Sequence, residues 1–399
     1  MDKRGDSSVE EVSVEGTIVL VLTLGVGISE WKQSQILQRE MALWRNYVEN
    51  NWSVWIISTS REDHVNQIAD TGAFGVQFLS LPPSGRLGSF FVPRSWKSQL
   101  EYYLKTLRGR SSVIVRTNQL WGAHLGAYLS RFLNCPLVIR QGFSLTEDLK
   151  QKRKNWIYRL LVQIYEKTFL RKASLAEFTT EHARMISYRS NKQPECVAVI
   201  PNFVDTQTWT PRKKLWTPKD FDIRLGYFGR LEPIKNLLNL IEALAGIQHV
   251  TLEIIGTGSQ RDALEEMSSK HQVATLFIPP LAPELLSTYI EEWTAAVFPS
   301  FHEGHPKAVI ETMTKGVPIV GTPVPGIREL LENGRGIVSS GVSSRELQTA
   351  ILEFLHKDVS EIRKMINRAQ EFSTSKYSLV SIAQEQRLVY GKIMRQYDN

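Results

Sequence analysis

The stretch from residue 297 to 320, VFPSFHEGHPKAVIETMTKGVPIV, decides how this chain of 399 residues folds. A buried-looking strand ends at Pro299, and Pro306 stands where a helix would begin, a position at which proline costs nothing because that N–H is unpaired anyway. Gly316 is typical of a helix C-cap, and an apolar run over 317–320 follows it. The stretch therefore predicts a strand, a helix and a second strand.

The same alternation recurs on both sides of this stretch, as in doubly wound parallel sheets. The strands expected in the first half are 17–23, 53–58, 112–116, 137–140, 175–179 and 197–200. Those expected in the second half are 224–228, 251–255, 275–278, 295–298 and 317–320. We expect an α/β fold with an N-terminal Rossmann-like domain over 1–205 and a C-terminal Rossmann-like domain over 206–375, with a linker between the two units over 205–222. A last helix over 376–399 can cross back to the first domain.

Open α/β sheets bind ligands at the carboxyl ends of their strands, so the loops after the strands matter most. In the opening stretch such a loop presents Glu303, and Glu311 follows eight positions later in the helix. Both glutamates can reach one cleft. The free amides of Lys307, Ala308 and Val309 at a positive helix end are expected to suit a phosphate.

A second loop points to the same ligand. Residues 225–236, LGYFGRLEPIKN, run from a strand through Gly229 into a turn with Arg230 and Lys235. Two bases on one loop suit a pyrophosphate, which needs positive charge on more than one oxygen. A plain surface loop with two bases is the alternative.

The first half offers fewer signals. Gly25 and Gly27 follow the first strand, but Glu30 stands where a dinucleotide fingerprint needs glycine, so an NAD site is excluded. Gly25, Gly27 and Ser29 fit either the first loop of a ligand cleft or a tight turn. Arg116 and Arg140 end two expected strands and are further cleft candidates.

Four motifs together resemble the retaining GT-B glycosyltransferases of family 4, glycosyl transferases group 1. VIPNFVDTQTWTP resembles the domain-crossing segment of that family, YFGRLEPIKN its diphosphate-binding loop and LEIIGTGSQRDALEEM its next strand, turn and helix. FPSFHEGHPKAVIETMTKGVPIVGTPVPGIRELL resembles its paired-glutamate signature. The resemblance covers most of the chain and is strongest over residues 197–340. It implies the GT-B fold, with two Rossmann-like domains facing a central cleft, of which the N-terminal one would be acceptor-binding and the C-terminal one would bind the nucleotide-sugar donor.

The resemblance also implies roles for single residues. Arg230 and Lys235, beside Gly229, would neutralise the diphosphate of a nucleotide-sugar. Glu303 would contact hydroxyls of the donor sugar, and Glu311 would bond the ribose. The remaining donor-binding positions lie in the segment that meets the sugar and the phosphate: Gly304, His305, Pro306, Lys307 and Ala308. Glu303, Arg230 and Lys235 are the residues expected to be catalytic.

The implied reaction is a retaining, hexosyl-type transfer in which the acceptor attacks the face that the diphosphate leaves. No metal and no other cofactor is expected, because placed cations and a helix N-terminus can stabilise the leaving group. A metal-dependent transferase would usually have an Asp-x-Asp motif after a strand. The Asp-x-Asp at Asp220 and Asp222 precedes one instead. Arg140-Gln141 and Pro279-Pro280 depart from the family pattern and leave a histidine role and the nucleotide base unassigned.

The expected partners are a nucleotide-sugar donor and a glycan or lipid-linked acceptor, as in polysaccharide biosynthesis. A GT-B sugar-nucleotide epimerase and a non-catalytic sugar-nucleotide-binding protein are the alternatives. Nucleic acid is not an expected partner, because the chain contains no recognition helix or stacking platform.

Charge is divided unevenly along the chain. The net charge is +7, and residues 1–205 carry all of it, whereas residues 206–399 sum to zero. Two cysteines cannot build a disulfide framework, and the first thirty residues are too acidic and their apolar run too short for a leader or a membrane span. We expect a cytoplasmic protein, with peripheral binding to the inner face of the membrane.

The basic segment over 150–172 suggests that membrane contact. It places Trp156, Ile157, Leu160, Leu161, Ile164, Thr168 and Phe169 on one helical stripe. A basic amphipathic helix of this kind can lie on an anionic membrane. The alternative is a helix whose apolar stripe packs on the sheet while its bases reach the solvent.

Overall fold

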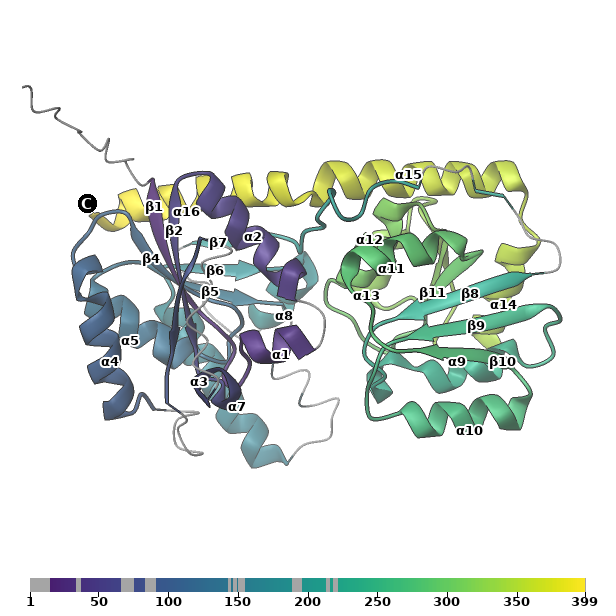
Figure 1. Cartoon of the computed structure of the whole chain (residues 1–399), viewed down its shortest axis with the longest axis horizontal. Coiled ribbons are helices and arrows are strands. Elements are labelled where there is room, and N and C mark those ends of the chain that lie inside the picture. Colours follow the sequence, from purple (N-terminus) through teal and green to yellow (C-terminus); the bar gives the residue numbers. More distant parts are fainter. Residues whose placement is uncertain are drawn as a thin grey trace, which may run out of the picture.

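The computed structural model describes residues 15–33, 37–65, 75–82, 91–142, 145, 149, 155–188, 196–212, 216–217 and 222–398. The bases of 150–154 and the pair Asp220-Phe221 lie outside these residues, so the structure does not place them. Within the described residues the chain forms two parallel sheets joined by two crossing segments (Figure 1). The prediction of a two-sheet α/β fold is confirmed.

The first sheet has seven parallel strands in the order β3-β2-β1-β4-β5-β6-β7. These strands are β1 (Gly16–Val21), β2 (Trp52–Ser58), β3 (Gln77–Ser80), β4 (Val113–Thr117), β5 (Leu137–Gln141), β6 (Leu175–Phe178) and β7 (Val197–Val199). The helices among them are α1 (Ile28–Gln33), α2 (Leu37–Glu49), α3 (Arg61–Val65), α4 (Arg94–Leu104), α5 (Ala123–Leu133), α7 (Trp156–Lys172) and α8 (Glu181–Tyr188). Every residue of β1 is buried, as expected of a central strand covered on both faces.

The second sheet has six parallel strands in the order β10-β9-β8-β11-β12-β13. They are β8 (Ile223–Phe228), β9 (Val250–Ile255), β10 (Ala274–Ile278), β11 (Ala295–Phe298), β12 (Ile319–Gly321) and β13 (Ile337–Val338). The helices are α9 (Leu237–Leu244), α10 (Arg261–His271), α11 (Pro283–Tyr289), α12 (Lys307–Lys315), α13 (Pro325–Leu331), α14 (Ser344–Leu355), α15 (Val359–Tyr377) and α16 (Leu379–Asp398).

The eleven expected strands are present within two residues of their expected bounds, and the expectation missed β3 and β13. Both missed strands stand at the edge of a sheet, and they have only four and two residues. Such short runs carry too little apolar alternation to be recognised from sequence.

The chain crosses between the domains twice, and the two crossings are hydrogen-bonded to each other. The Val204 N–H donates to the Tyr377 carbonyl at 2.7 Å, and the Leu379 N–H donates to the Val204 carbonyl at 2.9 Å. Beyond this bridge α15 lies along the second domain and α16 along the first, as the long yellow helices of Figure 1 show. The apolar face of α16, with Leu379 and Ile382, joins the core on one face of the first sheet.

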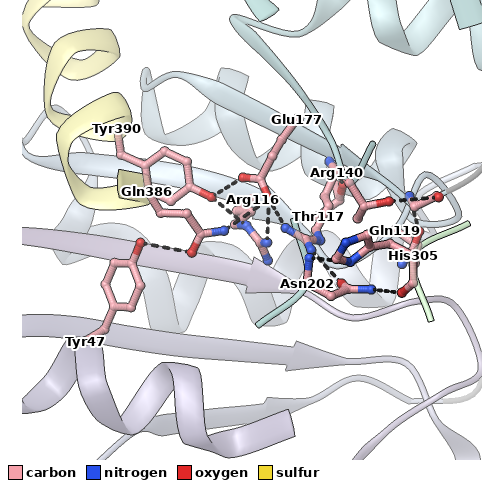
Figure 2. A network of polar contacts seen from close by, with 12 residues as sticks. Tyr47, Arg116, Thr117, Gln119, Arg140, Glu177, Asn202, His305, Gln386 and Tyr390 are labelled. Carbon is pink, nitrogen blue, oxygen red and sulfur yellow. Dashed lines mark hydrogen bonds and ion pairs between the residues drawn. The ribbon is translucent and has the colours of Figure 1, made fainter. Parts of the chain in front are cut away.

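A buried polar contact anchors α16 (Figure 2). The Tyr390 hydroxyl accepts a hydrogen bond from Arg116 Nε at 2.8 Å and donates one to Glu177 Oε2 at 2.5 Å. Gln386 Nε2 donates to Glu177 Oε1 at 3.1 Å. Because Arg116 lies in β4 and Glu177 lies in β6, the last helix is tied to the middle of the first sheet.

Replacing Tyr390 by phenylalanine tests this anchor. The change removes the hydroxyl that serves both Arg116 and Glu177, and leaves each of these buried groups short of one hydrogen bond, a loss of about 1–3 kcal/mol. We expect a lower free energy of unfolding in urea, followed by circular dichroism. Tyr397→Phe, at the exposed end of the same helix, is the matched control and should change stability by less than about 0.5 kcal/mol. Equal stability of Tyr390→Phe and the wild-type protein would contradict the anchor.

Candidate functional site

The loops after β8 and β11 meet at the carboxyl ends of these two neighbouring strands of the second sheet and bring together two predicted site residues. Lys235 ends a short 3-10 helix (Pro233–Lys235), and its Nζ lies 2.5 Å from Glu303 Oε1. The same carboxylate oxygen accepts a hydrogen bond from Ser300 Oγ at 2.8 Å. The amine and the carboxylate are both half-buried, so a ligand can reach them.

Backbone contacts hold these two loops against each other. Asn236 adopts a left-handed conformation directly after Lys235, and its Nδ2 donates to the carbonyls of Pro299 and Val342 at 2.8 Å. The Phe301 N–H donates to the Ile234 carbonyl at 2.9 Å. Arg230, on the first of the loops, is exposed. The arrangement places one exposed and one half-buried base on the loop where the sequence predicted two.

Glycines behind each loop let the backbones approach closely. A Cβ on Gly256 would lie 1.9 Å from the carbonyl oxygen of Gly229, and Gly256 has a φ of +149°. A Cβ on Gly326, at the start of α13, would lie 2.0 Å from the carbonyl oxygen of Gly304. Each loop of the site therefore rests on a neighbouring turn that has no room for a side chain.

Helix α12 begins at the site. Pro306 is its N-cap residue with extended dihedral angles, so the helix starts at Lys307 and not at Pro306 as predicted. Gly316 ends it in the left-handed conformation, as predicted. The Val309 N–H donates to the Pro306 carbonyl at 3.2 Å, which corrects the prediction that this amide is free. Helix geometry leaves the amides of Lys307 and Ala308 without a carbonyl in the helix, so these two can bind an anion.

The His305 side chain points away from this helix end and toward the crossing segments (Figure 2). Its Nδ1 accepts a hydrogen bond from the Asn202 N–H at 3.2 Å, and its carbonyl accepts one from Asn202 Nδ2 at 2.6 Å. The ring packs edge-on against Tyr377, with 4.9 Å between centroids. Burial, together with the positive charges of Arg140 and Lys376, lowers the pKa of His305 to about 3, so the imidazole is neutral. His305 thus connects the loop that carries Glu303 to both crossings.

Two ion pairs join α2 of the first domain to α12 of the second. Lys307 Nζ lies 2.8 Å from Glu40 Oε1, and Arg39 Nη1 lies 3.6 Å from Glu311 Oε1. Burial would raise the pKa of Glu40, but Lys307 and Arg39 outweigh it and lower the pKa to about 2. Burial raises the pKa of Glu311 despite the same two cations. Sequence reasoning did not identify Arg39 and Glu40 as interdomain residues, because nothing in an amphipathic helix shows which charges contact another domain.

The first glycine loop satisfies its own amides. The N–H groups of Ile28 and Ser29 donate to the Asp63 carboxylate at 2.9 and 2.7 Å, and the Gly27 N–H donates to Glu30 at 2.7 Å. A Cβ on Gly27 would lie 1.9 Å from Asp63. Gly25 has a φ of +73° with open space around it. This loop is a turn in which the amides of Gly27, Ile28 and Ser29 already donate to carboxylates. The space beside Gly25 is open.

Arg116 and Arg140 lie together in the buried cluster of Figure 2 rather than beside Lys235 and Glu303. Both form ion pairs with Glu177. They also line a cavity of about 190 Å³ that reaches Lys307 and Glu40 at the domain boundary. The structure therefore places these predicted residues in two groups. Lys235 and Glu303 lie at the carboxyl ends of strands of the second sheet, and Arg116 and Arg140 lie inside the first domain. No three His, Cys, Asp or Glu side chains in the described ranges are grouped so that they could hold a metal ion.

Two doubly wound parallel sheets joined by a double crossing constitute the GT-B fold. Solved structures agree with this fold. A sucrose-phosphate synthase from Thermosynechococcus elongatus superposes with a TM-score of 0.76 at 18% identity, covering 96% of this chain and 100% of that one. Anabaena HepE, in complex with UDP and glucose, gives a TM-score of 0.72 at 17% identity, with 94% and 100% covered.

Sequence comparisons point to the second domain. Residues 211–372 match the family described as glycosyl transferases group 1. A glycogen synthase from Mycobacterium tuberculosis is 28% identical over 200 residues, which are 49% of this chain and 48% of that protein. The Escherichia coli UDP-Gal:alpha-D-GlcNAc-diphosphoundecaprenol alpha-1,3-galactosyltransferase is 26% identical over 274 residues, 61% of this chain and 68% of that protein. The matched segment thus spans about half the length of the first of these relatives.

Substituting Gly326 by alanine tests the support of the Glu303 loop. The new Cβ would clash with the Gly304 carbonyl, so the loop or α13 must shift, at a cost of about 1–3 kcal/mol. We expect a lower melting temperature in calorimetry. Gly391→Ala is the matched control, because its Cβ on α16 meets only the end of Arg395 at 3.7 Å. A helical Gly→Ala change without a clash should raise stability by about 0.5–1 kcal/mol. Unchanged stability of Gly326→Ala would show that the loop does not depend on this contact.

Proposed function

We propose that the protein is a retaining, metal-independent glycosyltransferase of family 4 that moves a hexosyl group from a nucleotide-diphosphate-sugar to an acceptor hydroxyl. The observation that carries the proposal is the contact between Lys235 and Glu303 beside the start of α12. A cation, a carboxylate and free backbone amides converge there. Together they can bind a diphosphate and the hydroxyls of a sugar.

Each site residue then has a physical role. Breaking the bond between sugar and diphosphate concentrates negative charge on the leaving group, and fixed cations and amide dipoles stabilise it without reorganising. Lys235 and Arg230 supply the cations, and Lys307 and Ala308 supply the amides. Glu303, held by Lys235 and Ser300, orients the donor sugar. These groups do the work for which other transferases use a metal ion.

Glu311 is proposed to bond the ribose of the nucleotide. Its carboxylate lies 3.6 Å from Arg39 of the first domain. The Glu311 carboxylate, which would hold the nucleotide, is therefore also the group that Arg39 of the first domain contacts. Nucleotide binding and the approach of the two domains depend on the same side chain.

Retention of configuration requires no carboxylate nucleophile in this proposal. The acceptor hydroxyl attacks the face from which the diphosphate leaves, and a phosphate oxygen takes its proton. In this proposal Glu303, which contacts Lys235, binds sugar hydroxyls and does not form a covalent intermediate.

A glycan or a lipid-linked glycan intermediate is the proposed acceptor. The E. coli relative carries a diphosphoundecaprenol-linked acceptor in its name, and HepE was solved with UDP-glucose in one of its crystals. These facts support a UDP-sugar donor and an acceptor of the lipid-linked class.

The surface of α7 supports peripheral contact with an anionic membrane. Trp156, Ile157, Leu160, Leu161 and Ile164 are 46–67% exposed on one face of this helix. The opposite face packs on the domain through Val162, Tyr165 and Leu170, so the alternative in which the stripe covers the sheet is wrong for these five residues. Arg171 and Lys172 are exposed at the end of the helix. No helix within the described ranges is long and apolar enough to span a bilayer.

Turnover of a panel of nucleotide-sugars tests the enzyme proposal. With the accepted donor, Lys235→Ala and Glu303→Ala should lower kcat about 10²- to 10³-fold, the loss typical of one group that stabilises developing charge. Lys270→Ala, exposed on α10, is the matched control and should keep full activity. NMR of the first product should show the anomeric configuration of the donor, and a chelator should leave the rate unchanged.

The outcomes separate the alternatives. A new nucleotide-sugar without acceptor would indicate an epimerase, and donor binding without turnover would indicate a binding protein. Full activity of both variants would refute the site, inverted product would refute retention, and loss of activity in the chelator would refute metal independence.

Co-sedimentation with vesicles of phosphatidylcholine and phosphatidylglycerol tests the membrane contact. Ile157→Ser combined with Leu161→Ser should weaken binding by a factor of ten or more, since each buried aliphatic side chain contributes about 1.5–3 kcal/mol. Leu276→Ser with Leu285→Ser, exposed on the second domain, is the matched control and should bind like the wild-type protein. Salt should also weaken binding. Equal binding of both double variants would exclude α7 as the contact.

A further inference from the structure

The buried cluster of the first domain contains more positive than negative charge. Arg116 and Arg140 share a single carboxylate, Glu177, and all three residues are at least nine-tenths buried. Burial would raise the pKa of Glu177, but the two guanidinium groups and the Tyr390 hydroxyl outweigh it and lower the pKa to about 2. The carboxylate is therefore ionised, and the three groups sum to one positive charge.

The neighbours of the cluster do not cancel this charge. Tyr390, Gln386 and Asn202 are neutral partners, and His305 is neutral because its pKa is so low. Lys307 and Glu40, at the other side of the cavity, form a pair of their own. A buried charge without a counter-charge is expensive, and proteins rarely keep one without a use for it.

One hydrogen-bond donor of the cluster is unused. Arg116 donates through Nε to Tyr390 and through Nη2 to Glu177, while its Nη1 has no hydrogen-bond partner in the part of the chain that the structure describes. Arg116 lines the cavity of about 190 Å³, together with Arg140, Asn118, Gln119 and Asn202. Arg116 thus brings to the cavity wall an excess positive charge and a buried guanidinium nitrogen that has no partner among the described residues, and the amide groups of Asn118, Gln119 and Asn202 line the same cavity.

The size of the cavity limits what it can take. Its volume is smaller than that of pockets that enclose a whole drug-sized ligand. It has room for the anionic group of a larger molecule. Lys235 and Glu303 do not line it, whereas Lys307 does, so the cavity adjoins the proposed diphosphate site at the start of α12.

We propose that this cavity binds a small oxyanion, a phosphate or carboxylate that the acceptor carries. The acceptor part of this inference rests on the proposed function, whereas binding of the anion itself does not. Arg116 Nη1 donates to the oxyanion, and its charge neutralises the excess in the cluster. An acceptor held in this way would have its anionic end fixed in the first domain and its sugar toward the second.

Calorimetric titration of the full-length protein with inorganic phosphate tests the site. We expect wild-type binding to weaken at least tenfold in Arg116→Gln, because a hydrogen bond to a charged group is lost together with the excess charge. Arg116→Gln leaves Arg140 and Glu177 as a balanced pair. Asn118→Asp, which changes only one atom and keeps every arginine, should abolish binding by supplying a carboxylate in the cavity. Arg131→Gln, exposed on α5, controls for net charge and should bind like the wild-type protein.

Two further arms separate this proposal from the enzyme proposal. Lys235→Ala should lose donor turnover and keep phosphate binding. Once a donor is known, glucuronate-bearing or phosphorylated acceptors should exceed their neutral counterparts at least tenfold in kcat/KM, and Arg116→Gln should remove the preference. No phosphate binding by the wild-type protein, or binding by Arg116→Gln and Asn118→Asp as tight as that of the wild-type protein, would overturn the site. Loss of phosphate binding in Lys235→Ala would assign the anion to the donor site, and phosphate binding without an acceptor preference would overturn the acceptor role alone.

Discussion

The Glu177 carboxylate is the constraint on which the arrangement of the chain depends. It is fully buried in β6, and such a charge is tolerated only when every lone pair finds a partner. Its own domain supplies Arg116 and Arg140, and the remaining bonds come from Gln386 and Tyr390 of α16. The chain must therefore return from the second domain to complete the core of the first. The two domains cannot be independent units, because the last helix of the chain belongs to the first sheet.

The same network reaches the donor side. Arg140 donates to Asn202 at 2.9 Å, and Asn202 holds both the ring and the carbonyl of His305, two residues after Glu303. The ion pairs that Glu40 and Arg39 of α2 form with Lys307 and Glu311 lie in α12, the helix that follows His305. Because ion pairs of this kind add little net stability, we attribute to them the alignment of the domains. The loop that presents Glu303 is thus oriented by the domain proposed to hold the acceptor.

Sequence reasoning succeeded where local patterns carry the information. Central parallel strands are buried on both faces and read as apolar runs, so all eleven expected strands exist, and the strand-end rule brought Lys235 and Glu303 to one place. It failed where the information is long-range. Residue spacing does not predict the contact of Arg39 with Glu311 or the packing of His305 against Asn202, since both depend on how one domain meets the other. Val309 was predicted to have a free amide, but its N–H donates to the Pro306 carbonyl three residues earlier, in a tight first turn of α12 that the prediction did not foresee.

The positive charge of the first domain is of two kinds, exposed bases on the surface of α7 and a buried excess in its core, and the two act over different distances. Bases on the surface of α7 act through water, where salt screens them beyond about 10 Å, so they can only gather an anionic partner to the surface. The excess charge between Arg116, Arg140 and Glu177 is inside the protein, where it is poorly screened and acts at contact distance on whatever enters the cavity. Residues 206–399 sum to zero net charge, and the proposed diphosphate site relies on a few placed groups instead. An acceptor that is both membrane-bound and anionic would use each of the two in turn, the surface bases for encounter and the buried arginine for orientation.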